Sequence, residues 1–146
     1  MGDIREDRQK IGIEIQKLAI LLIKIPKSRW KELVLIAGRN AVGGKTSMLD
    51  MLFIKPKNDI FFRNALQKSF RAELNLTPLM QLREREQAIY NLCLEVGDDW
   101  NQLTICVDNQ GHFESFFDYP KTGIDSNPFN EANFEQWKRR FLTNQD

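Results

Sequence analysis

The chain has 146 residues, 42% hydrophobic and 28% charged, with a formal net charge of +1. These totals are typical of one globular domain over residues 1–146. The charged start, MGDIREDRQK, does not resemble a secretory signal. The most apolar run, Leu18 to Ile25, is far shorter than the roughly 18 residues of a membrane span. Two cysteines, Cys93 and Cys106, are too few for a disulfide scaffold. These features predict a protein of the reducing cytoplasm that does not bind a membrane.

The small net charge conceals two halves of opposite sign. Between Lys24 and Arg71, eleven basic residues stand against three acidic ones, a net charge of +8. Between Glu84 and Glu135, eleven acidic residues stand against two basic ones, a net charge of −9. Focused charge of one sign steers the association of a charged partner, so the asymmetry indicates binding. Alternatively, the two halves interleave in space and neutralise each other.

A long helix is the first predicted element. Apolar residues spaced by three, four and seven share one helical face: Ile4, Ile11, Ile15, Leu18, Leu22 and Ile25. Pro26 ends the helix, because the residue before a proline is disfavoured in the helical region. Ala19, Leu21 and Ile23 widen the apolar surface, so the helix is expected to lie beneath other elements.

A hairpin and a second helix follow. The β-formers of KELVLIAGRN and TSMLDMLFIKP flank Gly43-Gly44, a turn signal, and residues 59–63 either extend this hairpin or add a short third strand. Thr77 is expected to be the N-cap of the second helix, with Pro78 at its first position and Gly97 as its stop. The apolar stripe of this helix comprises Leu79, Leu82, Ile89, Cys93 and Val96, with one polar position at Glu86.

The last third of the chain predicts a second hairpin and a short helix. The hairpin is expected to have one dry face, formed by Leu103, Ile105, Val107, Phe113, Phe117 and Tyr119. Its other face is mostly polar, as in an antiparallel sheet covered by helices on one side. From about Asn130 the final helix presents Phe134, Trp137 and Phe141. The predicted fold is therefore α+β, a single antiparallel sheet built from two hairpins and packed by an N-terminal, a middle and a short C-terminal helix (α-ββ-α-ββ-α).

Neither of two catalytic patterns is complete. Gly44-Lys45-Thr46 resembles the end of a phosphate-binding loop, but five residues separate Gly38 from Gly44 where the motif has four. His112, the only histidine, shares a strand face with Glu114, and such a pair can act as general acid and base. Polar residues beside a turn are more often simply solvated, and zinc catalysis usually takes three ligands. The chain is therefore predicted to be a binding protein with no metal or cofactor, and not an enzyme.

Two charged surfaces are candidates for binding. Acidic residues cluster around the second hairpin: Asp98, Asp99, Asp108, Glu114 and Asp118. They form either a patch for a basic protein surface, such as a nuclease active site that normally holds phosphate, or a surface that only aids solubility. The basic stretch 24–57 adjoins Trp30 and Phe53, and it could hold single-stranded nucleic acid by stacking, although no RNP-like signature is present.

The order of these motifs resembles the YezG-like immunity proteins. The resemblance is specific over Trp100–Tyr119, with its W-x-x-L-T and F-D-Y motifs, and over Asn133–Leu142, with its aromatic-basic helix WKRRFL. It implies a small cytoplasmic antitoxin that binds a secreted toxin domain, often a nuclease, and blocks it. In that family the first hairpin tends to be acidic, whereas here it is basic through Arg39, Lys45, Lys55 and Lys57. No interface residue carries over for this reason.

We therefore expect an immunity protein that occludes the active site of a cognate toxin C-terminal domain, a nuclease, in a 1:1 complex. The partner-binding residues are expected to be Asp98, Asp99, Asp108, Glu114 and Asp118, with Phe116 as an apolar anchor on the same face. The alternative is a nucleic-acid-binding sheet protein that uses the basic first hairpin.

Overall fold

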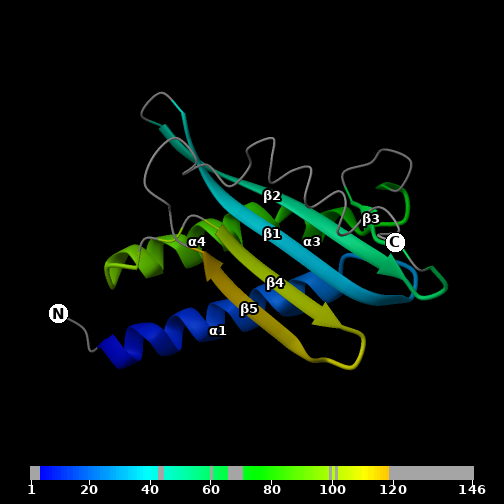
Figure 1. Ribbon diagram of the computed structural model, residues 1–146, viewed down its shortest axis with the longest axis horizontal. Coiled ribbons are helices and arrows are strands. Elements are labelled where there is room, and N and C mark those ends of the chain that lie inside the picture. Colours follow the sequence, from blue (N-terminus) through cyan, green and yellow to red (C-terminus); the bar gives the residue numbers. More distant parts are fainter. Residues whose placement is uncertain are drawn as a thin grey trace.

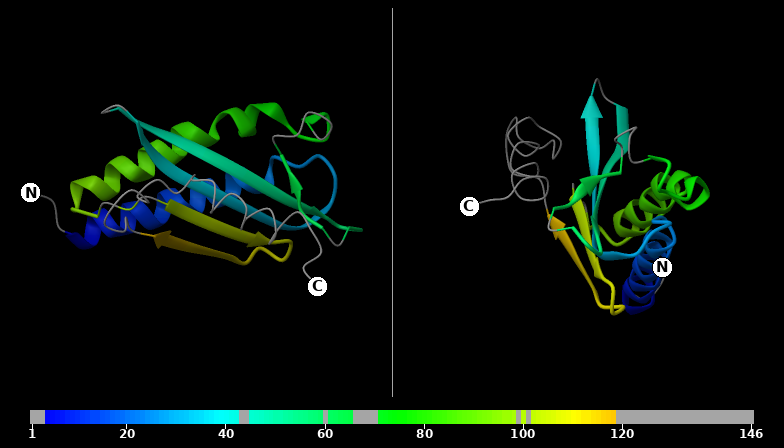
Figure 2. Two further views of the ribbon diagram at one scale, coloured as in Figure 1. Left: turned by 45° about the horizontal axis from the view of Figure 1, so that its top comes forward. Right: turned by 90° about the vertical axis from the view of Figure 1, so that its right-hand side faces the viewer.

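One antiparallel sheet carries the fold. A computed structural model describes residues 4–42, 45–59, 61–65, 71–98, 100 and 102–118. Its helices and strands are α1 (Ile4–Ile23), β1 (Trp30–Val42), β2 (Lys45–Pro56), β3 (Arg63–Asn64), α3 (Leu76–Met80), α4 (Leu82–Glu95), β4 (Gln102–Asp108) and β5 (Phe113–Asp118). The strand order is β3-β2-β1-β4-β5, and α1 and α4 lie on one side of the sheet (Figure 1; Figure 2, right). The predicted α+β class with a single antiparallel sheet is confirmed.

The strand arrangement departs from two simple hairpins. β3 adds a third strand beside β2, with Asn64 opposite Phe53. β1, the first strand of the β1–β2 hairpin, also pairs with β4 and so joins the two hairpins into one sheet. Lys45 begins β2 opposite Val42 in this antiparallel ladder, so Lys45 and Thr46 do not open a helix as a phosphate-binding loop requires.

The middle helix is divided and begins earlier than expected. Thr77, the predicted N-cap, lies inside α3, whose N-cap is Asn75, so Pro78 is not at the first position. Asn75 is fixed by tertiary contacts, because its side-chain amide donates to the Lys24 carbonyl at 2.9 Å and its N–H donates to the Ile25 carbonyl at 2.7 Å. Gln81 then separates α3 from α4. The predicted C-terminal helix lies outside the described residues.

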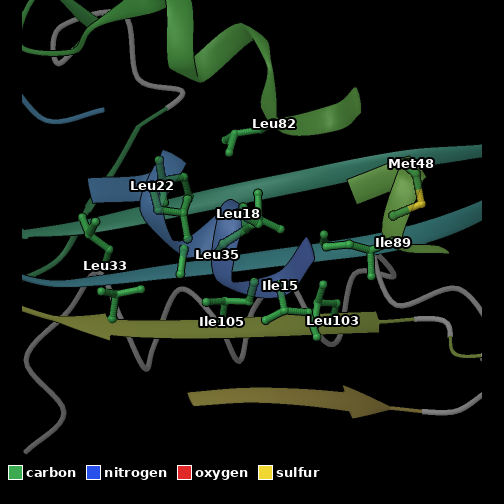
Figure 3. Packing of buried hydrophobic residues seen from close by; sticks show 14 of the residues in the cluster. Ile15, Leu18, Leu22, Leu33, Leu35, Met48, Leu82, Ile89, Leu103 and Ile105 are labelled. Carbon is green, nitrogen blue, oxygen red and sulfur yellow. The ribbon is translucent and has the colours of Figure 1, made fainter. Parts of the chain in front are cut away.

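A large hydrophobic core fills the space between the helices and the sheet. Leu18 and Leu22 of α1 point toward Leu35 of β1 and Ile105 of β4, and Ile89 of α4 lies in the same core nearer to Met48 and Leu103 (Figure 3). The predicted stripe of α1 is buried from Ile11 to Ile25. Of the residues expected to widen it, Ala19 is buried and Leu21 half-buried, but Ile23 is exposed. We call this side of the sheet the helix-covered face.

The opposite side of the sheet, the second face, has a smaller core of its own. Val34 and Ile36 of β1 and Met51 and Phe53 of β2 are buried there, and Phe62 and Cys106 pack against them. Successive side chains of a strand point to opposite faces, so β1 and β2 bury residues on both. A mostly polar face was expected of the final hairpin alone, and the second core lies chiefly over β1 and β2.

α4 ends just before the glycine that the sequence marks as a helix stop. Gly97 has a φ of +78°, a backbone region that favours glycine. The Asp98 N–H donates to the Cys93 carbonyl at 2.8 Å and the Gly97 N–H to the Leu94 carbonyl at 3.0 Å, which is a Schellman motif. The predicted stop at Gly97 is confirmed. None of the helices in the described ranges is long and apolar enough to cross a membrane.

Candidate functional site

The turn between β4 and β5 fixes the position of Asp108. The Asp108 N–H donates to the His112 carbonyl at 2.9 Å, and Gly111 completes the turn with a φ of +89°. The Asp108 carboxylate accepts hydrogen bonds from the N–H groups of Gln110 at 2.9 Å and His112 at 3.0 Å. Its other oxygen lies 3.1 Å from Nδ1 of His112. The carboxylate is thus held in one orientation at the tip of the hairpin.

These hydrogen bonds also determine the charge of Asp108. Desolvation tends to raise the pKa of its carboxyl group, but the N–H groups of His112 and Gln110 and the His112 imidazole outweigh it and lower that pKa. Hydrogen bonds to the charged form favour ionisation. Asp108 therefore carries a negative charge at neutral pH.

Asp108 lines a pocket of about 300 Å³ at this end of the sheet. We call it the acidic pocket, because its polar lining consists of Glu32, Asp108, His112 and Glu114, flanked by Phe62 and Phe113. The register brings the acidic residues together, since Glu32 of β1 lies directly opposite Asp108 of β4. Opposed like charges destabilise a sheet, and three carboxylates in one concavity focus a negative potential. The pocket is therefore suited to a cationic group.

The predicted binding residues do not form one patch. Asp108 and Glu114 meet in the acidic pocket. Asp98 lies beyond the other end of β4, about 20 Å away for a strand of this length. Asp118 is opposite Gln102 in the ladder, at that same distant end. Phe116, 50% exposed, lies between the two ends on the second face. Asp99 is outside the described residues.

Two features of the acidic pocket were not predicted from the sequence: the presence of Glu32 and the contact of His112 with Asp108. Glu32 belongs to the basic half of the chain, and only the β1–β4 register places it beside Asp108. No local signal identifies it. His112 contacts Asp108 and not Glu114. That contact was accessible from the sequence, since Asp at the start of a turn commonly accepts hydrogen bonds from N–H groups further along it.

A basic pocket of about 420 Å³ adjoins the same turn. The exposed side chains of Lys27, Arg29 and Lys57 line it together with Trp30 and Asn109. The Asn109 N–H donates to the Lys31 carbonyl at 2.9 Å, which holds the β4–β5 turn against the start of β1. The oppositely charged halves of the chain therefore meet at this end of the sheet without merging into one neutral surface. Phe53, the second aromatic residue proposed for stacking, is fully buried and cannot contact a base.

No metal centre accompanies these pockets in the described part of the chain, where no three His, Cys, Asp or Glu side chains gather to hold an ion. In comparisons with known proteins, no family model and no curated protein matches this sequence. A functional interpretation depends on the two pockets and on the motifs of the last third of the chain.

Proposed function

We propose that this chain is an immunity protein that binds a cognate bacterial toxin domain through the acidic pocket and blocks the toxin's active site. The observation that supports this most is the meeting of Asp108 and Glu114 with Glu32 in one concavity. A nuclease active site that holds phosphate is electropositive, and complementary charge speeds association and selects the partner. The toxin we propose is accordingly a nuclease.

The surroundings of the pocket suit a protein partner better than a small cation. Phe116, on the same strand and the same face as Glu114, is 50% exposed. Binding energy in protein interfaces concentrates on aromatic and charged anchors surrounded by weaker contacts. An interface of standard size, about 1,600 Å², would extend well beyond the pocket and cover Phe116.

Charge reversal of the pocket tests the proposal. The proposal predicts that the gene directly upstream encodes a toxin, and the C-terminal domain of that protein is the probe. The measurement is its dissociation constant by calorimetry at several salt concentrations. The double substitution Asp108→Lys and Glu114→Lys should weaken binding by roughly 100-fold, about tenfold for each charge. The remaining affinity should depend less on salt, because fewer charge pairs are screened.

A matched control separates the pocket from net charge. Glu84 and Glu95 of α4 are exposed and lie outside the acidic pocket, so Glu84→Lys with Glu95→Lys makes the same change in total charge. This control should bind the toxin domain as the wild type does. Equal losses in both double variants, or no loss in either, would remove the acidic pocket from the proposal.

The basic pocket supports a second candidate function, the binding of single-stranded nucleic acid. Lys27, Arg29 and Lys57 surround the half-buried Trp30, a combination that can hold a phosphate backbone and stack one base. A labelled RNA whose mobility shifts in a salt-dependent manner, and no longer shifts with Arg29→Glu, would favour this function. The mobility shift of the same RNA should be unchanged by the substitutions at Asp108 and Glu114.

A further inference from the structure

β5 is the last strand of the sheet, and within the described ranges no further strand pairs with it. The Asp108 N–H donates to the His112 carbonyl, and in an antiparallel ladder backbone groups that face the neighbouring strand recur at every second residue. The backbone groups of Glu114 and Phe116 therefore point toward β4, opposite Cys106 and Thr104. Those of Phe113, Ser115 and Phe117 point outward, and they form an edge with which no strand of the described residues pairs.

This edge has few of the features that usually protect a free strand. FESFFD has no proline and pairs with β4 without a break, and its two acidic residues, Glu114 and Asp118, alternate with the uncharged residues whose backbone groups point outward. A groove of about 440 Å³ runs between β5 and α1, lined by Gln9, Gly12, Ile13, Ile15, Gln16, Phe113 and Ser115. None of these side chains is charged, and Ile13 is 51% exposed. The edge and groove together form a neutral, partly apolar surface on an otherwise charged hairpin.

We propose that a second copy of this chain occupies the edge, with the two β5 strands paired antiparallel about a two-fold axis that passes between their Ser115 residues. In this register Phe113 lies opposite Phe117 of the second copy, so all three outward-facing residues find backbone partners. A shift of the axis to Glu114 would leave Phe117 unpaired and would place two Glu114 side chains opposite each other. Like charges directly opposed are destabilising, so the chain favours the register centred on Ser115.

Side chains that line the groove add contacts to the backbone pairing of the two β5 strands. Ile13 lines the groove beside Ser115, so the axis brings Ile13 of both copies to the same place. Phe113 and Phe117 lie on the same, helix-covered side of the sheet, and cross-strand aromatic pairs stabilise antiparallel strands. The contact is isologous, meaning that it closes on itself and does not propagate into a fibre. Both acidic pockets lie on the second face of the joined sheet, so the dimer does not depend on the proposed function.

Sedimentation equilibrium of the full chain, from low micromolar to submillimolar concentration, tests the dimer. The wild type should reach twice the 17.1 kDa of one chain. Ser115→Pro removes an outward N–H and no bond to β4, so it should weaken the dimer at least about tenfold while the fold is retained. Ile13→Glu should do the same, whereas Met80→Glu, at an exposed apolar position outside the groove, should not.

A charge pair at the axis tests the register itself. Ser115→Lys and Ser115→Glu should each be monomeric, because two like charges meet at the axis, and an equal mixture should recover a heterodimer. The same pair of substitutions at Gln110, in the turn, should leave the wild-type dimer intact. A wild type that stays at 17.1 kDa, or a Ser115→Lys variant that still dimerises, would overturn the proposal. So would a monomeric wild type whose binding to the toxin domain is weakened by Ser115→Pro, since the edge would then belong to the toxin.

Discussion

On the helix-covered face of the sheet, Glu86 of α4 is fully buried, whereas on the second face Asp108 and Glu114 remain at the surface. Burial raises the pKa of Glu86 well above its ordinary value, and the nearby charge of Asp50 raises it further, while Arg83 acts in the opposite direction. Hydrogen bonds at the β4–β5 turn lower the pKa of Asp108. Glu86 therefore costs stability when it ionises, and Asp108 is a charge available to a partner.

The helix-covered face should carry most of the stability. Leu18 is fully buried beneath the sheet, so Leu18→Ala should lower the free energy of unfolding by about 2–5 kcal/mol. Phe116 on the second face is half exposed, and Phe116→Ala should change it by only about 0.5 kcal/mol. Urea denaturation followed by circular dichroism measures both. Similar losses for the two variants would mean that β5 contributes to the core as much as α1 does.

Removal of the buried carboxyl group should stabilise the protein. Glu86→Leu should raise the free energy of unfolding at pH 7 by about 1–3 kcal/mol, because an apolar side chain pays no desolvation cost. Glu86 binds its proton more tightly in the folded state than in the unfolded chain. The stability of the wild type should therefore fall as the pH rises from the ordinary value of 4.5 through the raised pKa of Glu86.

Denaturation at a series of pH values measures this effect. The decline between acidic and neutral pH should be smaller in Glu86→Leu, whereas Glu84→Leu, at an exposed position of the same helix, should retain the wild-type profile. Identical profiles for wild type and Glu86→Leu would show that Glu86 ionises without cost, for example by gaining access to water.

The residues that sequence reasoning placed correctly are those with a local periodic signal. The stripe of α1 and the alternation of Leu103, Ile105 and Val107 each follow from a few neighbouring residues. The second core was also accessible, because the uninterrupted apolar run from Leu33 to Ala37 is typical of a strand buried on both faces.

The features that were missed depend on contacts between distant segments. Glu32 joins Asp108 only through the β1–β4 register. The early start of α3 depends on Asn75 reaching the end of α1. The predicted acidic residues do not share one site for a similar reason, because the length of β4 separates Asp98 from Asp108. A local pattern identifies the element that carries a residue, but the register decides which residues share a site.

The smallest expected effect on stability comes from Asp108 in the β4–β5 turn. Its ionisation stabilises the fold, whereas the ionisation of Glu86 destabilises it. The folded-state pKa of Asp108 lies below its ordinary value of 3.8, so the stability it contributes is present above that pH and is lost as the pH falls through the lowered pKa. Asp108→Ala removes the acceptor for the N–H groups of Gln110 and His112 and should lower the melting temperature slightly at pH 7.

The difference between Asp108→Ala and wild type should shrink as the pH falls through the lowered pKa of Asp108, because protonation removes the negative charge of the wild-type carboxyl group. Thermal unfolding from pH 7 to pH 2 measures this convergence. Asp98→Ala is the matched control, because Asp98 lies at the far end of β4. A difference that stays constant down to pH 2 would mean that the side chain stabilises the turn through its shape and not its charge. The turn would then keep its geometry independently of the charge that Asp108 offers to a cationic partner.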